Sequence, residues 1–274
     1  MTLPRVSRLI AACLIATPLL GLAACSSDRQ PTIAERPAED LFNEAMGLLR
    51  EGAPFDAARL FEEVDRQHPY SVWATKAQLL YAYSLYEMNK YDEAVAALDR
   101  FLALHPGSRD AAYAYYLKAM SYYERIADER RDQDATARAL EALQDVVRRF
   151  PDSIYARDAR LKIDLTRDNL AAKEMEVGRF YQKRNQYLAA INRYRRVVEQ
   201  YQTTSHIPEA LHRLTECYLA IGVVDEAQTA AAVLGHNYPG SDWYVDSYAL
   251  MTGARVVPQE NKGSWISRAW NSVF

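Results

Sequence analysis

Residues 38–252 repeat one arrangement of apolar, small and polar positions. Most of the repeated stretches end at a dipeptide of an aromatic residue or histidine followed by proline. Proline lacks a backbone donor and disfavours the helical conformation of the residue before it, so each of these dipeptides predicts the end of a helix. Tyr201-Gln202 holds the same position in one unit without a proline. The four dipeptides with proline are His68-Pro69, His105-Pro106, Phe150-Pro151 and Tyr238-Pro239. The pattern therefore predicts about five repeated units.

Three of the units place a small residue three positions before a bulky one. The pairs are Ala82 and Leu85, Gly178 and Tyr181, and Thr215 and Tyr218. The small side chain admits the backbone of a neighbouring antiparallel helix, and the bulky one fills the groove beside it. The units resemble the tetratricopeptide repeat (TPR), in which two helices are closed by a proline. We therefore expect an all-α fold, a right-handed superhelical solenoid of about five TPR-like helical hairpins over residues 38–252.

The third unit is longer than the others. Its two helices are expected over residues 110–126 and 136–150, and the charged segment 127–134 separates them as a loop. Residues 152–169 predict an extra helix before the fourth unit. The repeat is therefore expected to be irregular in the middle of the chain.

Residues 253–274 form a C-terminal tail of a different kind, with apolar residues spaced as one stripe of a short amphipathic helix. The stripe consists of Trp265, Ile266, Ala269, Trp270 and Val273. Such a helix could fold back as a cap on the last repeat, dock on a partner protein, or lie on a membrane surface. The sequence leaves these alternatives open.

The N-terminus has the features of a secretory signal peptide, because Arg5 and Arg8 precede an apolar run from Leu9 to Leu22. This run is too short to cross a bilayer as an ordinary helix of about 20 residues. Leu22-Ala23-Ala24-Cys25 resembles the lipobox of bacterial lipoproteins. The resemblance implies removal of residues 1–24 and attachment of lipid to Cys25. The alternative is an unlipidated secreted protein with a cysteine here by chance.

Serine, not aspartate, follows this cysteine at position 26, so the signal that keeps many lipoproteins in the inner membrane is absent. The resemblance therefore implies a protein on the inner leaflet of the outer membrane, lipid-anchored and facing the periplasm. Residues 25–37 are mostly polar after the cysteine and hold two prolines. We expect this segment to be a flexible tether between the lipid and the folded domain.

Charge and cysteine content limit the possible partners. Removal of Arg5 and Arg8 with the signal leaves 31 basic residues against 36 acidic ones, a formal charge of −5. A mildly acidic chain is not suited to wrap nucleic acid. Cys217 would be the only free thiol of the mature chain, so no internal disulfide is expected. Within a helix, Cys217 is expected to be a small buried hydrophobic residue.

No motif for catalysis or cofactor binding is found in the sequence. It has neither a Gly-rich phosphate loop after a strand nor a His-Glu-x-x-His zinc helix. His212 and Glu216 lie four positions apart on one helical face, and we expect an ion pair there, not a metal site. A periplasmic hydrolase would need a nucleophile–base pair, for which the sequence offers no candidate. We expect no catalytic residue, no metal and no cofactor except the covalent lipid on Cys25.

Aromatic residues are unusually dense in the second and third units. Side chains two positions apart on a helix, as at Tyr81 and Tyr83, point in different directions, so both rings cannot belong to one core face. Exposed rings in a groove provide large contact areas for an extended peptide at a small cost in entropy. The residues that we expect to bind an unfolded, aromatic-rich client peptide are Trp73, Tyr81, Tyr83 and Tyr116. The alternative is that each of these rings is part of the core.

Basic residues are concentrated in the fourth unit. Arg179, Lys183 and Arg184 lie near the end of its first helix, and Arg193, Arg195 and Arg196 lie in its second. An arginine in mid-helix, such as Arg193, could form a bidentate pair with a carboxylate of a partner protein. The alternative is a solvated charged surface.

Particular strings make residues 26–250 similar to the BamD family, lipoproteins of the β-barrel assembly machinery. The strings are Arg66-Gln-His-Pro-Tyr-Ser71, Ala82-Tyr-Ser-Leu-Tyr86, Ala97-Leu-Asp-Arg-Phe101, Arg149-Phe-Pro-Asp-Ser-Ile-Tyr155 and Asn192-Arg193. The resemblance implies a scaffold that binds the periplasmic domains of the barrel protein BamA, joins other assembly lipoproteins and receives unfolded outer-membrane proteins. Arg193 matches the family's helix arginine at the BamA interface, and Arg184 matches a nearby basic position. The N-terminal repeats match the proposed client-binding half.

Two other functions are less consistent with the sequence. A TPR lipoprotein could be an adaptor for peptidoglycan enzymes or cell-division proteins, but such adaptors often carry a coiled coil, and the sequence has no a/d heptad run. The hydrolase lacks a catalytic pair. The sequence therefore favours a non-catalytic assembly scaffold.

Overall fold

The computed structural model describes residues 34–272, so the predicted signal peptide and Cys25 lie outside the described residues. Within this range the chain forms helices and no strand. The helices are α1 Ala38–Arg50, α2 Pro54–Gln67, α3 Val72–Glu87, α4 Tyr91–Leu104, α5 Ala111–Tyr123, α6 Asp134–Arg149, α7 Ile154–Lys183, α8 Tyr187–Gln200, α9 Ile207–Ala220, α10 Val224–Asn237, α11 Asp242–Gly253 and α12 Trp265–Asn271. Among the described helices, none is both long and apolar enough to span a membrane.

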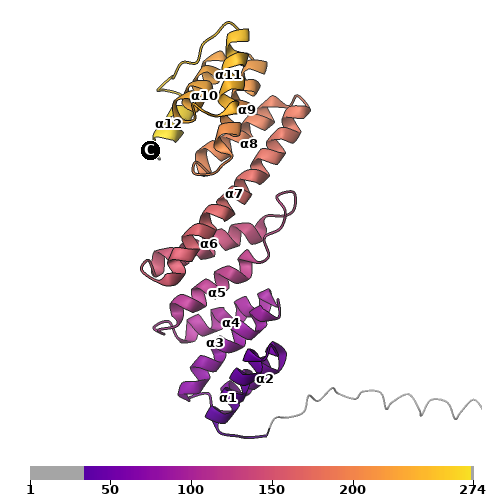
Figure 1. The fold of residues 1–274 in the computed structure, drawn as a ribbon, viewed down its shortest axis with the longest axis vertical. Coiled ribbons are helices and arrows are strands. Elements are labelled where there is room, and N and C mark those ends of the chain that lie inside the picture. The colour runs from indigo at the N-terminus through magenta and orange to yellow at the C-terminus, as the bar shows by residue number, and fades with distance from the viewer. Residues whose placement is uncertain (1–33, 273–274) are drawn as a thin grey trace, which may run out of the picture.

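Consecutive helices stack into an elongated array that runs from α1 at one end to α11 and α12 at the other (Figure 1). The first ten helices form five hairpins, α1/α2, α3/α4, α5/α6, α7/α8 and α9/α10. Each of these ten helices packs mainly on its neighbours in the chain. The expected all-α solenoid of five TPR-like hairpins is therefore confirmed.

The residue that ends each hairpin has the same backbone conformation in all five cases. Its φ lies between −130° and −135° and its ψ between 40° and 56°. These residues are His68, His105, Phe150, Tyr201 and Tyr238. Tyr201 has the same φ as His105, −130°, although no proline follows it. The repeat position, and not proline alone, therefore sets this conformation.

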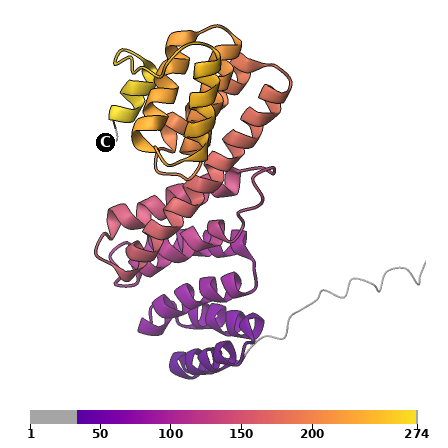
Figure 2. The ribbon, with the colours of Figure 1, turned by 45° about the horizontal axis from the view of Figure 1, so that its top comes forward.

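The middle of the chain differs from the expectation in one respect. The predicted extra helix and the first helix of the fourth hairpin are one continuous helix, α7, of 30 residues. Neither proline nor glycine interrupts the chain between Ser153 and Gly178, so nothing stops the helix at Asn169. The N-terminal part of α7 packs on α6 and its C-terminal part on α8. It thus connects the two halves of the molecule (Figure 2).

Gly178 shows why a small residue stands on α7. A Cβ atom added there would lie 2.4 Å from the Cε1 atom of Tyr194 on α8. The ring of Tyr194 is fully buried, and its hydroxyl donates to Oε1 of Gln182 at 2.8 Å. The glycine therefore admits the tyrosine ring between the two helices of the fourth hairpin.

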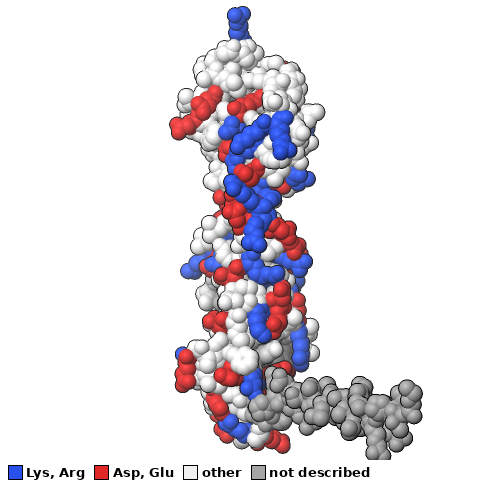
Figure 3. Space-filling model, turned by 90° about the vertical axis from the view of Figure 1, so that its right-hand side faces the viewer, with Lys and Arg blue, Asp and Glu red and all other residues white. Residues whose placement is uncertain are grey.

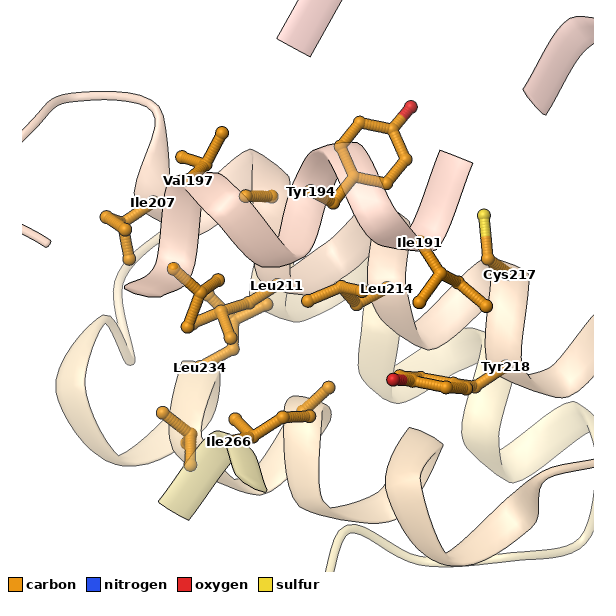
Figure 4. Close-up of a cluster of buried hydrophobic side chains, with 14 of the residues drawn as sticks. Ile191, Tyr194, Val197, Ile207, Leu211, Leu214, Cys217, Tyr218, Leu234 and Ile266 are labelled. Carbon is orange, nitrogen blue, oxygen red and sulfur yellow. The ribbon is translucent and has the colours of Figure 1, made fainter. Parts of the chain in front are cut away.

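The tail folds back onto the solenoid and does not project from it. Helix α12 packs against α8 and α10, and Ile266 is fully buried in the core of the last two hairpins (Figure 4). Trp270 is 7% exposed, and Nε1 of Trp265 donates to the hydroxyl of Tyr218 at 3.0 Å. Among the three alternatives for this helix, the structure shows the cap. Val273, the last residue of the predicted stripe, lies outside the described residues.

Candidate protein-binding surfaces

Five tyrosines from three successive hairpins lie next to one another, and we call them the tyrosine band. Tyr83 and Tyr86 come from α3, Tyr113 and Tyr116 from α5, and Tyr155 from α7. The rings of Tyr83 and Tyr86 are stacked with centroids 6.4 Å apart. Tyr155 lies 5.3 Å from Tyr116 and 5.5 Å from Tyr113. The stacking of hairpins therefore joins rings that are far apart in the sequence.

Carboxylates accept hydrogen bonds from the hydroxyl groups of the band. The hydroxyl of Tyr86 donates to Oε1 of Glu124 at 3.3 Å, and that of Tyr116 donates to Asp158. Burial, together with the nearby carboxylates Glu124 and Asp158 respectively, raises the pKa of Tyr86 and of Tyr116 well above the ordinary tyrosine value. These phenols stay protonated at any physiological pH, so the band carries aromatic surface next to negative charge.

The side chains of the band are partly accessible to solvent. All five tyrosines are half-buried and pack on the apolar cores of the second to fourth hairpins. Half-buried aromatic rings on a fixed backbone can contact the side chains of an extended peptide with little loss of rotamer entropy. This arrangement suits binding of a polypeptide, and no reactive group is part of it.

The structure separates the four residues that were expected to bind client peptide. Tyr83 and Tyr116 both belong to the tyrosine band. Trp73 instead packs on Phe42 of α1, with ring centroids 4.9 Å apart, and belongs to the core of the first hairpin. Tyr81 lines a cavity between α2 and α4. Whether these residues bind a client stays a prediction, but they do not form one continuous surface.

Tyr155 belongs to this surface but could not be predicted as a member from its sequence position. Tyr155 is the second residue of α7, in a string whose other residues close the third hairpin. Its place after Ser153, the N-cap of α7, is the only local signal. Ring contacts with α5 depend on how α7 packs, which the repeat pattern does not give.

The basic residues of α8 have partners within the chain. Nη1 of Arg193 lies 3.2 Å from Oε2 of Glu174 on α7, and Nη1 of Arg196 lies 3.3 Å from the other oxygen of the same carboxylate. Arg195 covers the ring of Trp265 at 4.7 Å. The pairing of Arg193 with a carboxylate of a partner protein stays a prediction, and within the chain Arg193 shares Glu174 with Arg196. One third of its side chain stays exposed, so a second contact is sterically open.

Arg184 has a separate environment at the turn between α7 and α8. Its guanidinium lies 4.1 Å from the ring centroid of Phe180, which is itself 48% exposed. On the face in Figure 3, Lys and Arg side chains gather in the middle and upper parts of the molecule, with Asp and Glu between them. Arg184 is thus an exposed cation on an apolar ring, whereas Arg193 is paired with a carboxylate of its own chain.

A network of ion pairs links α7 to α9. Arg179 binds Glu209 at 2.9 Å, and Arg213 binds Glu209 at 3.4 Å and Glu216 at 2.8 Å. All four side chains are at most 30% exposed. Half-buried ion pairs of this kind position the two helices relative to each other.

The expected pair of His212 and Glu216 is confirmed, with Nε2 of His212 3.5 Å from Oε1 of Glu216. The other ring nitrogen of His212 is 2.8 Å from the hydroxyl of Ser247. Burial raises the pKa of Glu216, but hydrogen bonds from His212, Arg213 and Gln182 outweigh it and lower the pKa to about 2. In residues 34–272, no three side chains of the metal-binding types are grouped as a metal site would require.

Cys217 is fully buried beside this network, as expected for a small hydrophobic residue. Burial and the negative charge of Glu216 raise its pKa to about 12. The thiol is therefore protonated and unreactive at neutral pH.

Stacked TPR-like hairpins with half-buried aromatic and charged surfaces define a helical-repeat protein. The model of the outer membrane lipoprotein family YfiO matches residues 34–252. BamD of Caulobacter vibrioides is 50% identical over 251 residues, covering 91% of this chain and 82% of its own length. BamD of Rickettsia prowazekii is 43% identical (90% and 98%), and that of Neisseria meningitidis Z2491 is 32% identical (84% and 91%). The chain therefore belongs to the BamD family of outer membrane lipoproteins.

Proposed function

We propose that this protein is a non-catalytic scaffold for the assembly of outer-membrane β-barrels. The relatives named above are outer membrane protein assembly factors. The observation that carries the proposal is the tyrosine band, to which three successive hairpins contribute half-buried aromatic rings that pack side by side. Its function is to hold an unfolded outer-membrane protein before insertion. No bond needs to be made or broken in this role.

The proposed location follows from Cys25. Lipid on this residue would hold the protein on the inner leaflet of the outer membrane, with the solenoid in the periplasm. Eight residues lie between Cys25 and Ala34, the first described residue, and a chain of that length spans at most roughly 30 Å. The first hairpin therefore stays close to the membrane surface on which clients are inserted.

The second binding surface of the proposal is the face of α8 around Arg193, with Arg184 nearby. It would bind the periplasmic domains of BamA, and other assembly lipoproteins would join the same complex. Support comes from the exposed third of the Arg193 side chain and from the exposed Arg184 on Phe180. The tyrosine band is built from α3, α5 and the start of α7, so a client and BamA can be bound at the same time.

Tyr116→Leu tests the client surface. Leucine keeps the apolar bulk but removes the ring face and the hydroxyl, so binding of an unfolded outer-membrane barrel protein should weaken about fivefold. The measurement is a titration of the urea-diluted barrel protein. Tyr122→Leu is the matched control. Tyr122 lies on the same helix as Tyr116, but it is not part of the tyrosine band and lines a cavity with Lys118 and Arg138. Equal affinities of the two variants would remove the tyrosine band from client binding.

Arg193→Gln tests the partner surface, and Arg196→Gln is its control. Both substitutions remove one of the two arginines that share Glu174. If Arg193 contacts BamA, only its substitution should reduce co-purification with the BamA periplasmic domains, by roughly fivefold for a partly exposed ion pair. Equal losses in both variants would show that the arginines act only by holding Glu174.

A further inference from the structure

A cavity of about 360 Å³ lies between α2 and α4, and Tyr81 of α3 also lines it. Positions 81 and 83 are about 200° apart around a helix, so this cavity faces away from the tyrosine band. Its floor is apolar, because Phe61, Leu85 and Phe101 are at most 3% exposed. The volume is at the lower end of the range for ligand pockets and suits one large side chain with its neighbours.

The rim of this cavity is acidic. Glu62 and Asp65 project from α2, and Glu93 projects from α4. Asp65 is already satisfied, because it binds Arg100 at 3.2 Å and accepts a hydrogen bond from Gln78 at 2.7 Å. Among the described residues that line the cavity, Arg100 is the only cation. The lining of the cavity therefore has two more carboxylates than cations.

Two of these carboxylates are open to a ligand. Within residues 34–272, Glu62 has no ion-pair or hydrogen-bond partner, and Glu93 pairs only with the exposed Lys90 at 3.3 Å. Burial, together with the negative charges of Glu62 and Glu93, raises the pKa of Tyr81. The Tyr81 ring is thus influenced by the negative charge of Glu62 on α2 and that of Glu93 on α4.

We propose that this cavity binds one cationic side chain, an arginine or lysine, of a protein partner. The aliphatic stem would lie on the apolar floor, and the cationic group would meet Glu62, Glu93 and the face of Tyr81. Complementary charge identifies the occupant, since a neutral apolar side chain would leave the excess negative charge of the cavity uncompensated and an acidic one would be repelled. The site is separate from the tyrosine band and from Arg193, so it does not depend on the proposed function.

The probe for this site is the dipeptide Ac-Leu-Arg-NH₂, compared with Ac-Leu-Gln-NH₂ and Ac-Leu-Glu-NH₂. We expect saturable ¹⁹F shifts at Tyr81 in the full chain labelled with 3-fluorotyrosine, the signal being assigned with Tyr81→Phe. The arginine peptide should bind about fivefold more tightly than the glutamine peptide, and the glutamate peptide should not bind. Equal affinity for arginine and glutamine would show an apolar pocket only and overturn the proposal.

Glu62→Gln combined with Glu93→Gln should reduce the affinity for the arginine peptide about fivefold, to that of the glutamine peptide. Glu39→Gln combined with Asp164→Asn is the matched control, because both residues are exposed, lie outside the cavity and give the same change in charge. A second variant, Ala96→Trp, places an indole in the cavity from its exposed wall and should abolish the shifts. An equal effect of the control pair, or binding that survives Ala96→Trp, would contradict the proposal.

Discussion

Trp270→Ala is expected to lower the free energy of unfolding by about 3–5 kcal/mol, the usual cost of removing a buried tryptophan. Trp270 is 7% exposed and its ring contacts that of Tyr238 at 6.0 Å. The substitution would open a cavity between α12 and α10 and detach Ile266 from the core of the last hairpins. Urea denaturation followed by circular dichroism measures the loss.

Asn271→Ala is the control on the same helix, since Asn271 is exposed and should change stability by less than about 0.5 kcal/mol. If both substitutions had the same small effect, α12 would not be docked on the solenoid. Its tryptophans would then again be candidates for binding a membrane or a partner protein. The prediction therefore decides between the alternatives that the sequence left open for the tail.

The repeat could be predicted because its signals are local. The residue at the end of each second helix adopts one conformation, and proline after it marks the place in four of five cases. The continuity of α7 was missed for the opposite reason. The repeat pattern predicted a boundary near Asn169, but a helix ends only where a breaker or a competing contact ends it, and the sequence up to Gly178 has no breaker.

The candidate surfaces could be predicted only in part, because their partners come from other helices. The spacing of Tyr81 and Tyr83 correctly indicated two different faces. The carboxylate that holds Arg193 lies 19 positions earlier, at Glu174 on α7, and helical periodicity cannot show such a contact. The same holds for Tyr155, whose ring reaches α5 only through the packing of α7. Periodicity gives the direction of a side chain, whereas stacking decides what it meets.

Gly178→Ala is expected to lower the free energy of unfolding by about 1–3 kcal/mol, the usual cost of overpacking a core. Helix propensity alone would predict the opposite sign, a gain of roughly 1 kcal/mol for replacing glycine within a helix. The added Cβ would lie 2.4 Å from a ring carbon of Tyr194, and this ring is enclosed by the core of the last two hairpins. It cannot move aside without disturbing the contact between α7 and α8.

Gly47→Ala separates the effect of helix propensity from that of overpacking. Gly47 lies within α1, and a Cβ there would meet no atom within 4 Å. It should stabilise the protein by up to about 1 kcal/mol. In a Tyr194→Leu background, which replaces the ring with a smaller side chain, Gly178→Ala should lose most of its cost, because the two residues are in direct contact. Urea denaturation of the four proteins of this cycle measures the coupling. An unchanged cost in that background would show that Gly178 is required for a reason other than the Tyr194 ring.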